Sequence, residues 1–214
     1  MRYLLILFLV FGLHFTYAQN PKRLKKEVRE YKKLDRKKLK QGDILFVGSS
    51  SIRFWETLEQ DFPNHKVFNR GFGGSQMSDL LFYLKKLVLK YKPKQIFIYE
   101  GDNDINDRES PSSNLQETKI IIQKIHEKLP DTEIVLISAK PSISRWELKK
   151  EYEKLNKMFE EYTREHSFLK FVDVWNPMLN DQGEPKKDIF IADDLHMNAK
   201  GYQIWKEVIR PYLK

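Results

Sequence analysis

The sequence predicts an α/β protein with a single domain built on a parallel sheet. The chain has 214 residues, of which 41% are hydrophobic and 32% charged, and this supplies one sizeable core but not comfortably two. Short runs rich in β-branched and aromatic residues alternate with longer segments of helical pattern. Several of the short runs, such as ILFV and IVLI, are apolar throughout. Continuous apolar strands are typical of a parallel sheet covered by helices on both faces.

The chain begins with the features of a signal peptide. Arg2 precedes an apolar run between Leu4 and Leu13, and a small-residue cleavage site ends at Ala18. An uncleaved membrane anchor is the alternative, but the run is shorter than the roughly 20 residues that span a bilayer. We therefore expect residues 1–18 to direct export to a periplasm or to the cell exterior. The sequence contains no cysteine, which excludes a disulfide framework, a thiol nucleophile and a thiolate zinc site.

A basic segment follows between Lys22 and Lys40. It carries most of the formal net charge of +8. Its apolar residues recur near helical spacing, which predicts an amphipathic helix within residues 19–41 that packs on the domain through Leu24, Val28, Tyr31, Leu34 and Leu39. The alternative is attraction of the basic face to an anionic lipid or polysaccharide surface. Nucleic acid is not expected as a partner, because no basic motif occurs elsewhere in the chain.

Residues 42–214 are expected to form the domain itself. Short apolar runs predict strands at 44–47, 67–69, 95–99, 133–137 and 168–174. Helical patterns bounded by Gly, Pro, Asp or Asn predict helices at 51–58, 75–90, 112–129, 145–165 and 198–210. No repeat or linker indicates a second domain. In open parallel sheets ligands bind at the carboxyl ends of the strands, so the loops after the strands are the expected place for function.

The first such loop contains the turn Gly48-Ser49-Ser50. Small residues at a strand-to-helix turn allow backbone amides to face a ligand and a serine to act as a nucleophile. A simple helix cap is the alternative interpretation. The nucleophile turn of α/β-hydrolases requires glycine two residues after the serine, and Ile52 occupies that position here.

The second loop has three glycines in four residues, at Gly71, Gly73 and Gly74. Such a turn lets backbone amides approach an anion closely, or it is simply a tight turn. It matches neither the dinucleotide fingerprint nor a P-loop, so nucleotide binding is not expected.

The third loop is acidic and contains an asparagine. Asp102, Asp104 and Asn106 have the spacing that begins a calcium loop, but Asp107 and Ser113 stand where that loop needs Gly and Glu. Loose cation binding stays open as an alternative. The amide of Asn103 can instead donate a hydrogen bond to developing negative charge.

The fourth loop places Asp193 three residues before His196. An acid at this spacing can fold back to hold the Nδ1 proton of the imidazole, which leaves Nε2 free as an acceptor. The other histidines have no zinc-binding spacing. The four loops together provide a nucleophile, hydrogen-bond donors, a base and a group that orients the base.

These four motifs resemble, in their order and context, the four blocks of the SGNH hydrolases, also called GDSL-like lipases or acylhydrolases. The phrases ILFVGSSSIRFW, NRGFGGSQMSDL, YEGDNDI, KPSISRW and DDLHMNAKGY resemble a bacterial branch similar to platelet-activating-factor acetylhydrolases. The resemblance covers the chain from Gly42 to Leu213. It implies a three-layer α/β sandwich with a five-stranded parallel sheet in flavodoxin-like order.

The resemblance also implies roles for five residues. Ser50 corresponds to the nucleophile, His196 to the base and Asp193 to the acid that orients it. The backbone amides of Ser50 and Gly74 and the side chain of Asn103 correspond to the donors of an oxyanion hole. The family usually has aspartate where this chain has Ser49. Neither a metal nor an organic cofactor is implied.

The natural ester is less well determined by the sequence. Residues near these turns that are candidates for substrate contact are Arg53, Arg70, Phe72, Asp104, Arg145 and Trp146. Their arginines suit an anionic group and their aromatic rings a sugar. We expect a small-molecule or polysaccharide substrate, with acetyl esters on carbohydrate ahead of lysophospholipid or other lipid esters. A catalytically silent carbohydrate-binding protein is a further alternative. The segment between Lys140 and Trp146 has no role that the sequence explains.

Overall fold

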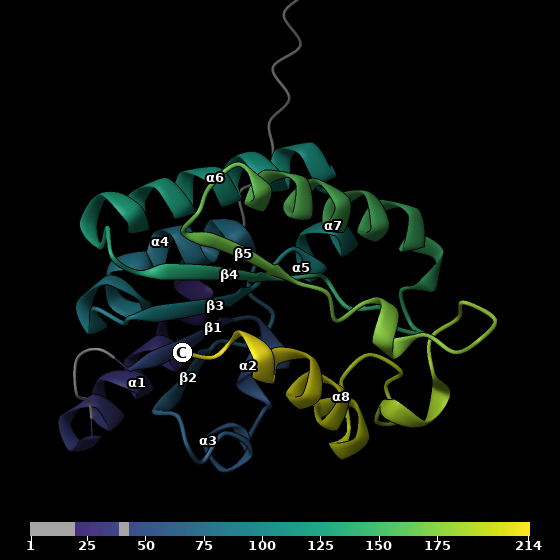
Figure 1. The fold of residues 1–214 in the computed structure, drawn as a ribbon, viewed down its shortest axis with the longest axis horizontal. Helices are drawn as coiled ribbons and strands as arrows, with labels where there is room; N and C mark the ends of the chain where they lie inside the picture. Colours follow the sequence, from purple (N-terminus) through teal and green to yellow (C-terminus); the bar gives the residue numbers. More distant parts are fainter. Residues whose placement is uncertain (1–19, 39–42) are drawn as a thin grey trace, which may run out of the picture.

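The computed structural model describes residues 20–38 and 43–214, and the expected signal peptide and Leu39 therefore lie outside the described residues. The fold is a three-layer α/β sandwich (Figure 1). Its central sheet has five parallel strands in the order β2-β1-β3-β4-β5. Both the sheet and its order agree with the expected architecture. Among the described residues, no helix is long and apolar enough to cross a bilayer.

The strands lie where the apolar runs predict them, with small shifts at their ends. Their bounds are β1 Ile44–Gly48, β2 Val67–Gly71, β3 Gln95–Tyr99, β4 Glu133–Ile137 and β5 Leu169–Val172. Every residue of β1 and β3, two of the three inner strands, is buried, which explains their largely apolar sequences. The register pairs Gly48 with both Gly71 and Tyr99. The carboxyl ends of β1, β2 and β3 therefore lie level at one edge of the sheet.

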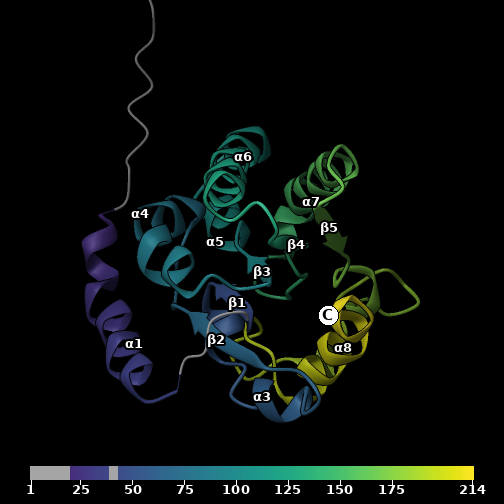
Figure 2. The ribbon, with the colours of Figure 1, turned by 60° about the vertical axis from the view of Figure 1, so that its left-hand side comes forward.

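Helices cover both faces of the sheet (Figures 1 and 2). One face packs against α1 Lys25–Lys38, α4 Met77–Leu87, α6 Pro111–Lys128 and α7 Lys149–Arg164, which share one apolar core with the sheet. The other face packs against α2 Ser50–Arg53, α3 Leu58–Asp61 and α8 Ala199–Ile209 in a second core. The sheet separates these two cores, as alternate side chains of each strand point to opposite faces.

The expected helix at residues 51–58 is wrong. The chain instead forms the two short helices α2 and α3, because Trp55 turns inward between them and is only 1% exposed. Its ring packs against Phe46 and Trp205, and its Nε1 donates to Asp61 at 2.8 Å. Tertiary packing of one large side chain thus overrides the local helical pattern.

A short helix, α5 (Asp102–Asn106), occupies the third loop, where no helix was expected. Asp104 causes it locally, because its carboxylate accepts from the backbone N–H of Gly101 at 3.1 Å and caps the first turn. Gly101 has a φ of +102°, which favours glycine. The turn aims the side chain of Asn103 back toward the carboxyl ends of the strands.

The basic N-terminal segment forms α1, preceded by a 3₁₀ turn at Pro21–Leu24. Leu24 and Val28 are buried, as the apolar stripe predicts, and they join the core that contains α4. Leu34 departs from the prediction, since it is 56% exposed. The helix lies at the β2 side of the molecule, beside α4 (Figure 2).

Candidate active site

The site is built where β1 ends. Gly48 has a φ of +141°, and a Cβ at this position would lie 2.0 Å from the carbonyl oxygen of Tyr99 on β3. Glycine therefore allows the end of β1 to pass close to β3 before the chain turns into α2. Ser50 is the first residue of α2, which places its hydroxyl at the carboxyl edge of the sheet.

Three side chains form a continuous hydrogen-bonded series at this edge. Ser50 Oγ lies 2.9 Å from Nε2 of His196, and Nδ1 of His196 lies 2.5 Å from Oδ2 of Asp193. Oδ1 of Asp193 also accepts from the backbone amides of Leu195 at 3.0 Å and His196 at 2.9 Å. Such a series suits proton removal from the serine, with Asp193 holding the imidazole in the required tautomer.

Asp193 is ionised over almost the whole pH range. Burial tends to raise the pKa of its carboxyl, but the hydrogen bonds from the His196 side chain and from the backbone amides of His196 and Leu195 lower that pKa to about 2. A fixed negative charge beside Nδ1 favours the protonated imidazole that forms when the serine gives up its proton.

The loops after β1, β2 and β3 carry three candidate hydrogen-bond donors, which are the backbone N–H groups of Ser50 and Gly74 and the side chain of Asn103. Gly74 has a φ of +69°, and the turn of residues 71–74 carries its backbone N–H. Among the described residues, no acceptor takes the N–H of either Ser50 or Gly74. The side-chain nitrogen of Asn103 donates to the carbonyl of Ser75 at 2.8 Å and keeps a second hydrogen free. These donors suit stabilisation of an oxyanion.

Arg145 sets the orientation of the Asn103 amide. Both of its terminal nitrogens lie 3.2 Å from Oδ1 of Asn103. Because a guanidinium only donates, the amide oxygen must face Arg145 and the NH₂ group must face Ser75 and the site. Arg145 is in turn held by Asp102, whose Oδ1 lies 2.5 Å from Nη1.

A buried charge network, formed by Asp102, Lys140 and Arg145, lies beneath these residues. Nζ of Lys140 is 3.7 Å from Asp102 and donates to the carbonyl of Leu195 at 2.7 Å. Tyr99 donates to Asp102 at 2.9 Å. The network thus joins Asn103 on one side to the loop of His196 on the other.

Electrostatics keep this network charged despite its burial. Burial alone would raise the pKa of Asp102, but Lys140 and Arg145 hold that pKa below its ordinary value. Burial lowers the pKa of Lys140, and Asp102 opposes that shift. The backbone amides of Ile143 and Ser144 also donate to the carbonyl of Asp194, each at 3.1 Å. The segment between Lys140 and Trp146 therefore supports the loop that carries His196.

A comparison with protein-family models identifies the family of this chain. A model of the GDSL-like lipase/acylhydrolase family matches residues 46–204. The chain belongs to this family. It is accordingly a carboxylic ester hydrolase, and the resemblance found in its motifs is confirmed. No sequence among curated proteins matches it.

Solved structures resemble this GDSL-like hydrolase over most of its length. A protein from Streptococcus pneumonia, described as a platelet activating factor, is 26% identical with a TM-score of 0.81, covering 90% of this chain and 94% of that one. A GDSL-like lipase from Bacteroides thetaiotaomicron is 19% identical with a TM-score of 0.70, covering 90% and 96%. A carbohydrate esterase of family 3 from Talaromyces cellulolyticus is 16% identical with a TM-score of 0.67, covering 80% and 96%. The last two similarities concern the fold alone.

Three of the residues expected to contact substrate are buried in the hydrolase, and those predictions are wrong. Phe72 is 0% exposed and packs in the core beside Tyr83. Arg70 pairs with Asp35 at 2.7 Å, and its guanidinium lies over the rings of Tyr31 and Tyr91. Asp104 is also fully buried, where it accepts from backbone amides.

The remaining candidates lie nearer the surface, but each has a partner within the chain. Arg53 forms an ion pair with Glu27, and Arg145 is occupied by Asp102 and Asn103. The ring of Trp146 stacks on that of Trp175, with centroids 5.8 Å apart. The arginines near the serine therefore do not offer an unpaired charge to an anionic substrate.

Phe54 is a site residue that the sequence analysis missed. Its side chain is 44% exposed, and its ring meets that of His196 edge-on with centroids 5.0 Å apart. The prediction of a continuous helix through residues 51–58 concealed it, because a helix interior gives no reason for an apolar side chain to face the serine. Its position directly after Arg53 in the turn was the available signal.

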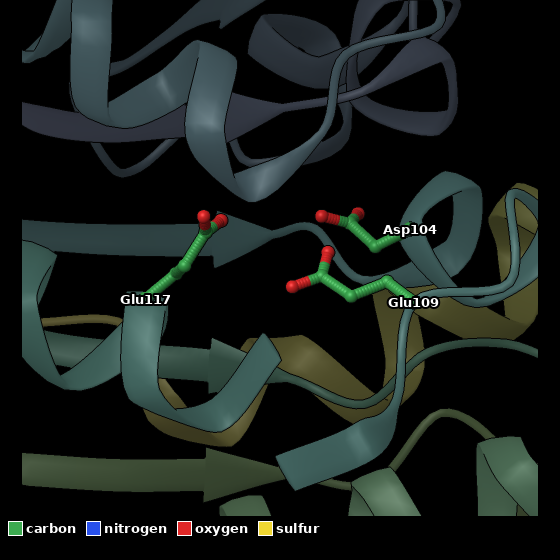
Figure 3. Close-up of side chains that lie close together, drawn as sticks. All are labelled: Asp104, Glu109 and Glu117. Atoms are coloured by element: carbon green, nitrogen blue, oxygen red, sulfur yellow. The ribbon is translucent and has the colours of Figure 1, made fainter. Parts of the chain in front are cut away.

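A group of carboxylates lies near α5 but apart from the serine. Oxygens of Asp104, Glu109 and Glu117 come within 4.8 Å of one another (Figure 3). Burial, with the nearby charge of Glu109, raises the pKa of Asp104 to about 8 and that of Glu117 to about 7. Oxygen ligands of this kind suit a hard cation. Asp102, the first residue of the acidic loop, is not part of this group, because its carboxylate pairs with Arg145.

Proposed function

We propose that the chain is an exported serine esterase that removes short acyl groups, chiefly acetyl, from carbohydrate esters. The observation that carries this proposal is the series Ser50, His196 and Asp193, with a serine-to-imidazole distance of 2.9 Å. The loops that carry the proposed donors Ser50, Gly74 and Asn103 follow strands whose carboxyl ends are level. That arrangement supplies every group that acyl transfer requires.

In the proposed reaction Ser50 Oγ attacks the ester carbonyl carbon while His196 Nε2 takes the hydroxyl proton. The oxyanion of the tetrahedral intermediate accepts from the backbone N–H groups of Ser50 and Gly74 and from the Asn103 side chain. The C–O bond to the alcohol then breaks, and His196 gives its proton to the leaving oxygen. A water molecule, deprotonated by His196, attacks the acyl-enzyme, and the acid leaves as Ser50 regains its proton.

The charge around the serine supports a neutral substrate. Arg53 and Arg145 are each neutralised by a carboxylate. An exposed apolar group near the serine is Phe54, beside His196. An unpaired cation would favour the phosphate of a phospholipid headgroup, whereas an acetylated sugar is bound by apolar and hydrogen-bonding contacts. The similarity in fold to a carbohydrate esterase is consistent with this class.

A lipid ester is the second candidate. The similarity to the Streptococcus pneumonia protein, at 26% identity, favours it, and so does the exposed ring of Phe54. Release of acetate from acetylated xylan, compared with release of fatty acid from micellar lysophosphatidylcholine, separates the two. We expect the hydrolase to act on the xylan at a kcat/KM at least tenfold higher; the reverse preference would replace the carbohydrate proposal with the lipid one.

The serine mechanism has a direct test. Purified protein is treated with a fluorophosphonate probe and assayed on p-nitrophenyl acetate, as wild type and as Ser50→Ala, Ser49→Ala and Ser51→Ala. We expect labelling and turnover to vanish only in Ser50→Ala, because the flanking serines are buried, at 1% and 2% exposure. Loss in Ser49→Ala or Ser51→Ala with retention in Ser50→Ala would move the nucleophile, and an inert wild type would exclude the mechanism.

Export is proposed from the first residues alone, and it has a separate test. When the full chain is expressed in a bacterial host, we expect the mature protein outside the cytoplasm with Gln19 as its first residue. Recovery of the uncut chain in the cytoplasm would contradict the proposal.

A further inference from the structure

One face of the basic N-terminal segment contacts the turn that carries the Gly74 donor. Arg23, Glu27, Tyr31 and Asp35 are spaced four residues apart, so they share this face. Arg23 donates to the carbonyl of Gly74 at 3.0 Å, and Glu27 accepts from the amide of Gly73 at 2.9 Å. Further along, Tyr31 donates to the carbonyl of Gly71, and Asp35 binds Arg70. The helical stripe and the turn thus run side by side in opposite directions.

The turn of residues 71–74 has few local hydrogen bonds, which run from the Gly71 amide to Oδ1 of Asn69 at 2.7 Å and from the Ser75 amide to the Phe72 carbonyl at 3.3 Å. Three of its four residues are glycines, which have no side chain to pack and the widest backbone freedom. The remaining residue of the turn, Phe72, anchors it to the core. The Phe72 amide donates to the carbonyl of Gly48 at 2.8 Å. The backbone of Gly73 and Gly74 beyond this anchor is bonded by side chains of the N-terminal segment.

Glu27 also reaches the helix of the nucleophile. One of its carboxylate oxygens accepts from Gly73, and the other pairs with Arg53, which lies three residues after Ser50 on α2. The close approach of Gly71 supports the same link, because a Cβ there would lie 2.3 Å from the amide of Arg53. Glu27 therefore connects the two segments that supply the backbone donors of Ser50 and Gly74.

We propose that Arg23, Glu27 and Tyr31 are positioning residues of the oxyanion hole. They hold the turn of residues 71–74 so that the Gly74 N–H faces the acyl oxygen at a fixed distance from the Ser50 N–H. The catalytic consequence rests on the proposed function. The N-terminal segment lies outside residues 46–204, which match the family model.

The kinetic test uses Glu27→Ala, Tyr31→Phe and Arg23→Ala with p-nitrophenyl acetate. Oxyanion donors act mainly on the transition state, so kcat should fall roughly tenfold while KM changes by less than about twofold. Outright loss of a donor, which costs roughly 10²- to 10³-fold, is the upper limit. Glu27→Gln keeps an acceptor for the Gly73 amide, and we expect it to recover most of the kcat lost in Glu27→Ala.

Matched controls come from the exposed side of the same helix. Arg29→Ala and Glu30→Ala remove the same types of side chain where they face solvent. We expect both to keep kcat within about twofold of wild type. A loss in these controls equal to that in Glu27→Ala would show a general effect on the helix and would overturn the proposal.

A second measurement does not depend on activity. Amide hydrogen exchange of a peptide covering residues 71–76 should be at least several-fold faster in Glu27→Ala than in wild type or Glu30→Ala, because the Gly73 amide loses its acceptor. Unchanged exchange together with unchanged kcat would overturn the proposal. If wild type is neither labelled by fluorophosphonate nor active, the proposed function fails, and the exchange result alone decides whether the helix holds the turn.

Discussion

The turn of residues 193–196 and the buried charge network beneath it use charge in opposite ways. In the turn the side chains of Asp193 and His196 are 42% and 22% exposed. In the network those of Lys140, Asp102 and Arg145 are 1%, 7% and 13% exposed. The turn is held by hydrogen bonds within four residues of sequence, whereas the network joins residues about 40 positions apart. The turn carries the proposed proton transfer. The network holds Asn103 and the loop of His196 in position.

The difference has an energetic reason. Removing three charges from water is costly unless each is paired and hydrogen-bonded. Asp102 accepts from Arg145, Tyr99 and Tyr152, and Lys140 donates to Leu195. Substitution in the network should therefore affect stability first, whereas substitution in the exposed turn should affect activity with little loss of stability.

Asp193→Asn should give the largest effect, and on activity alone. An amide at this position favours the wrong tautomer of His196, for which a loss in kcat of about 10⁴-fold is expected from comparable sites. The matched control is Asp194→Asn, on an exposed neighbour, which should keep kcat within about twofold. Kinetics on p-nitrophenyl acetate and urea unfolding measure both quantities. Marked destabilisation by Asp193→Asn would show that the exposed turn also contributes to stability.

The depressed pKa of Asp193 adds a pH prediction. A folded pKa of about 2 lies below the ordinary value of about 3.9, so the stabilisation from this carboxylate is present above about pH 4. It is lost only as the pH falls toward 2. Circular dichroism should therefore show a folded chain at pH 4. Any activity that is lost when the pH is lowered to 4 should be recovered fully on return to pH 7.

Lys140→Met should give the largest loss of stability. It leaves Asp102 without one of its two cationic partners, and breaking a buried pair costs about 3–5 kcal/mol in the free energy of unfolding. The control Lys157→Met removes a lysine that is 75% exposed and paired with Glu161, and should cost less than about 1 kcal/mol. Equal losses in urea unfolding would show that the network contributes no more than a surface pair.

Arg145→Lys tests how the buried network affects activity, because Arg145 belongs to the network and also contacts Asn103 of the site. Lysine keeps a positive charge for Asp102 but lacks the planar fork that also holds the Asn103 oxygen. We expect kcat to fall by about 10²-fold, approaching the loss of one oxyanion donor. Arg164→Lys, in an exposed pair with Glu160, is the control and should leave kcat unchanged.

Glu117→Gln should give the smallest effect. Glu117 is half-buried, so its burial is intermediate between that of the exposed turn and that of the buried network. The folded pKa of about 7 lies above the ordinary value of about 4.3, so stability falls as pH rises from about 4 to 7. Gln removes this ionisation and should raise the free energy of unfolding at pH 8 by less than about 1 kcal/mol, because solvent screens the group. No gain is expected at pH 4. Glu127→Gln, which removes an exposed carboxyl from the same helix, is the control.

Long-range contacts explain where the sequence analysis of the site failed. Phe72 and Arg70 lie in or next to the glycine turn, which suggested contact with substrate, yet both side chains turn inward. The partner of Arg70 is Asp35, and the amphipathic pattern of that helix does not indicate which segment its polar face meets. The support given by Lys140 likewise depends on a contact with Leu195, 55 positions away.

The α/β class, the positions of the five strands and the four loops that carry the site can all be read from the amino-acid sequence. These loops carry Ser50, Gly74, Asn103, Asp193 and His196. These are local properties, since apolar runs, glycine turns and the Asp-x-x-His spacing each act within a few residues. Three other features arise from packing between distant segments: Trp55 interrupts a helix, Phe54 lies against His196, and the N-terminal helix contacts the glycine turn. Such outcomes depend on which distant side chains share a core or complete a charge pair, and no local pattern records that choice.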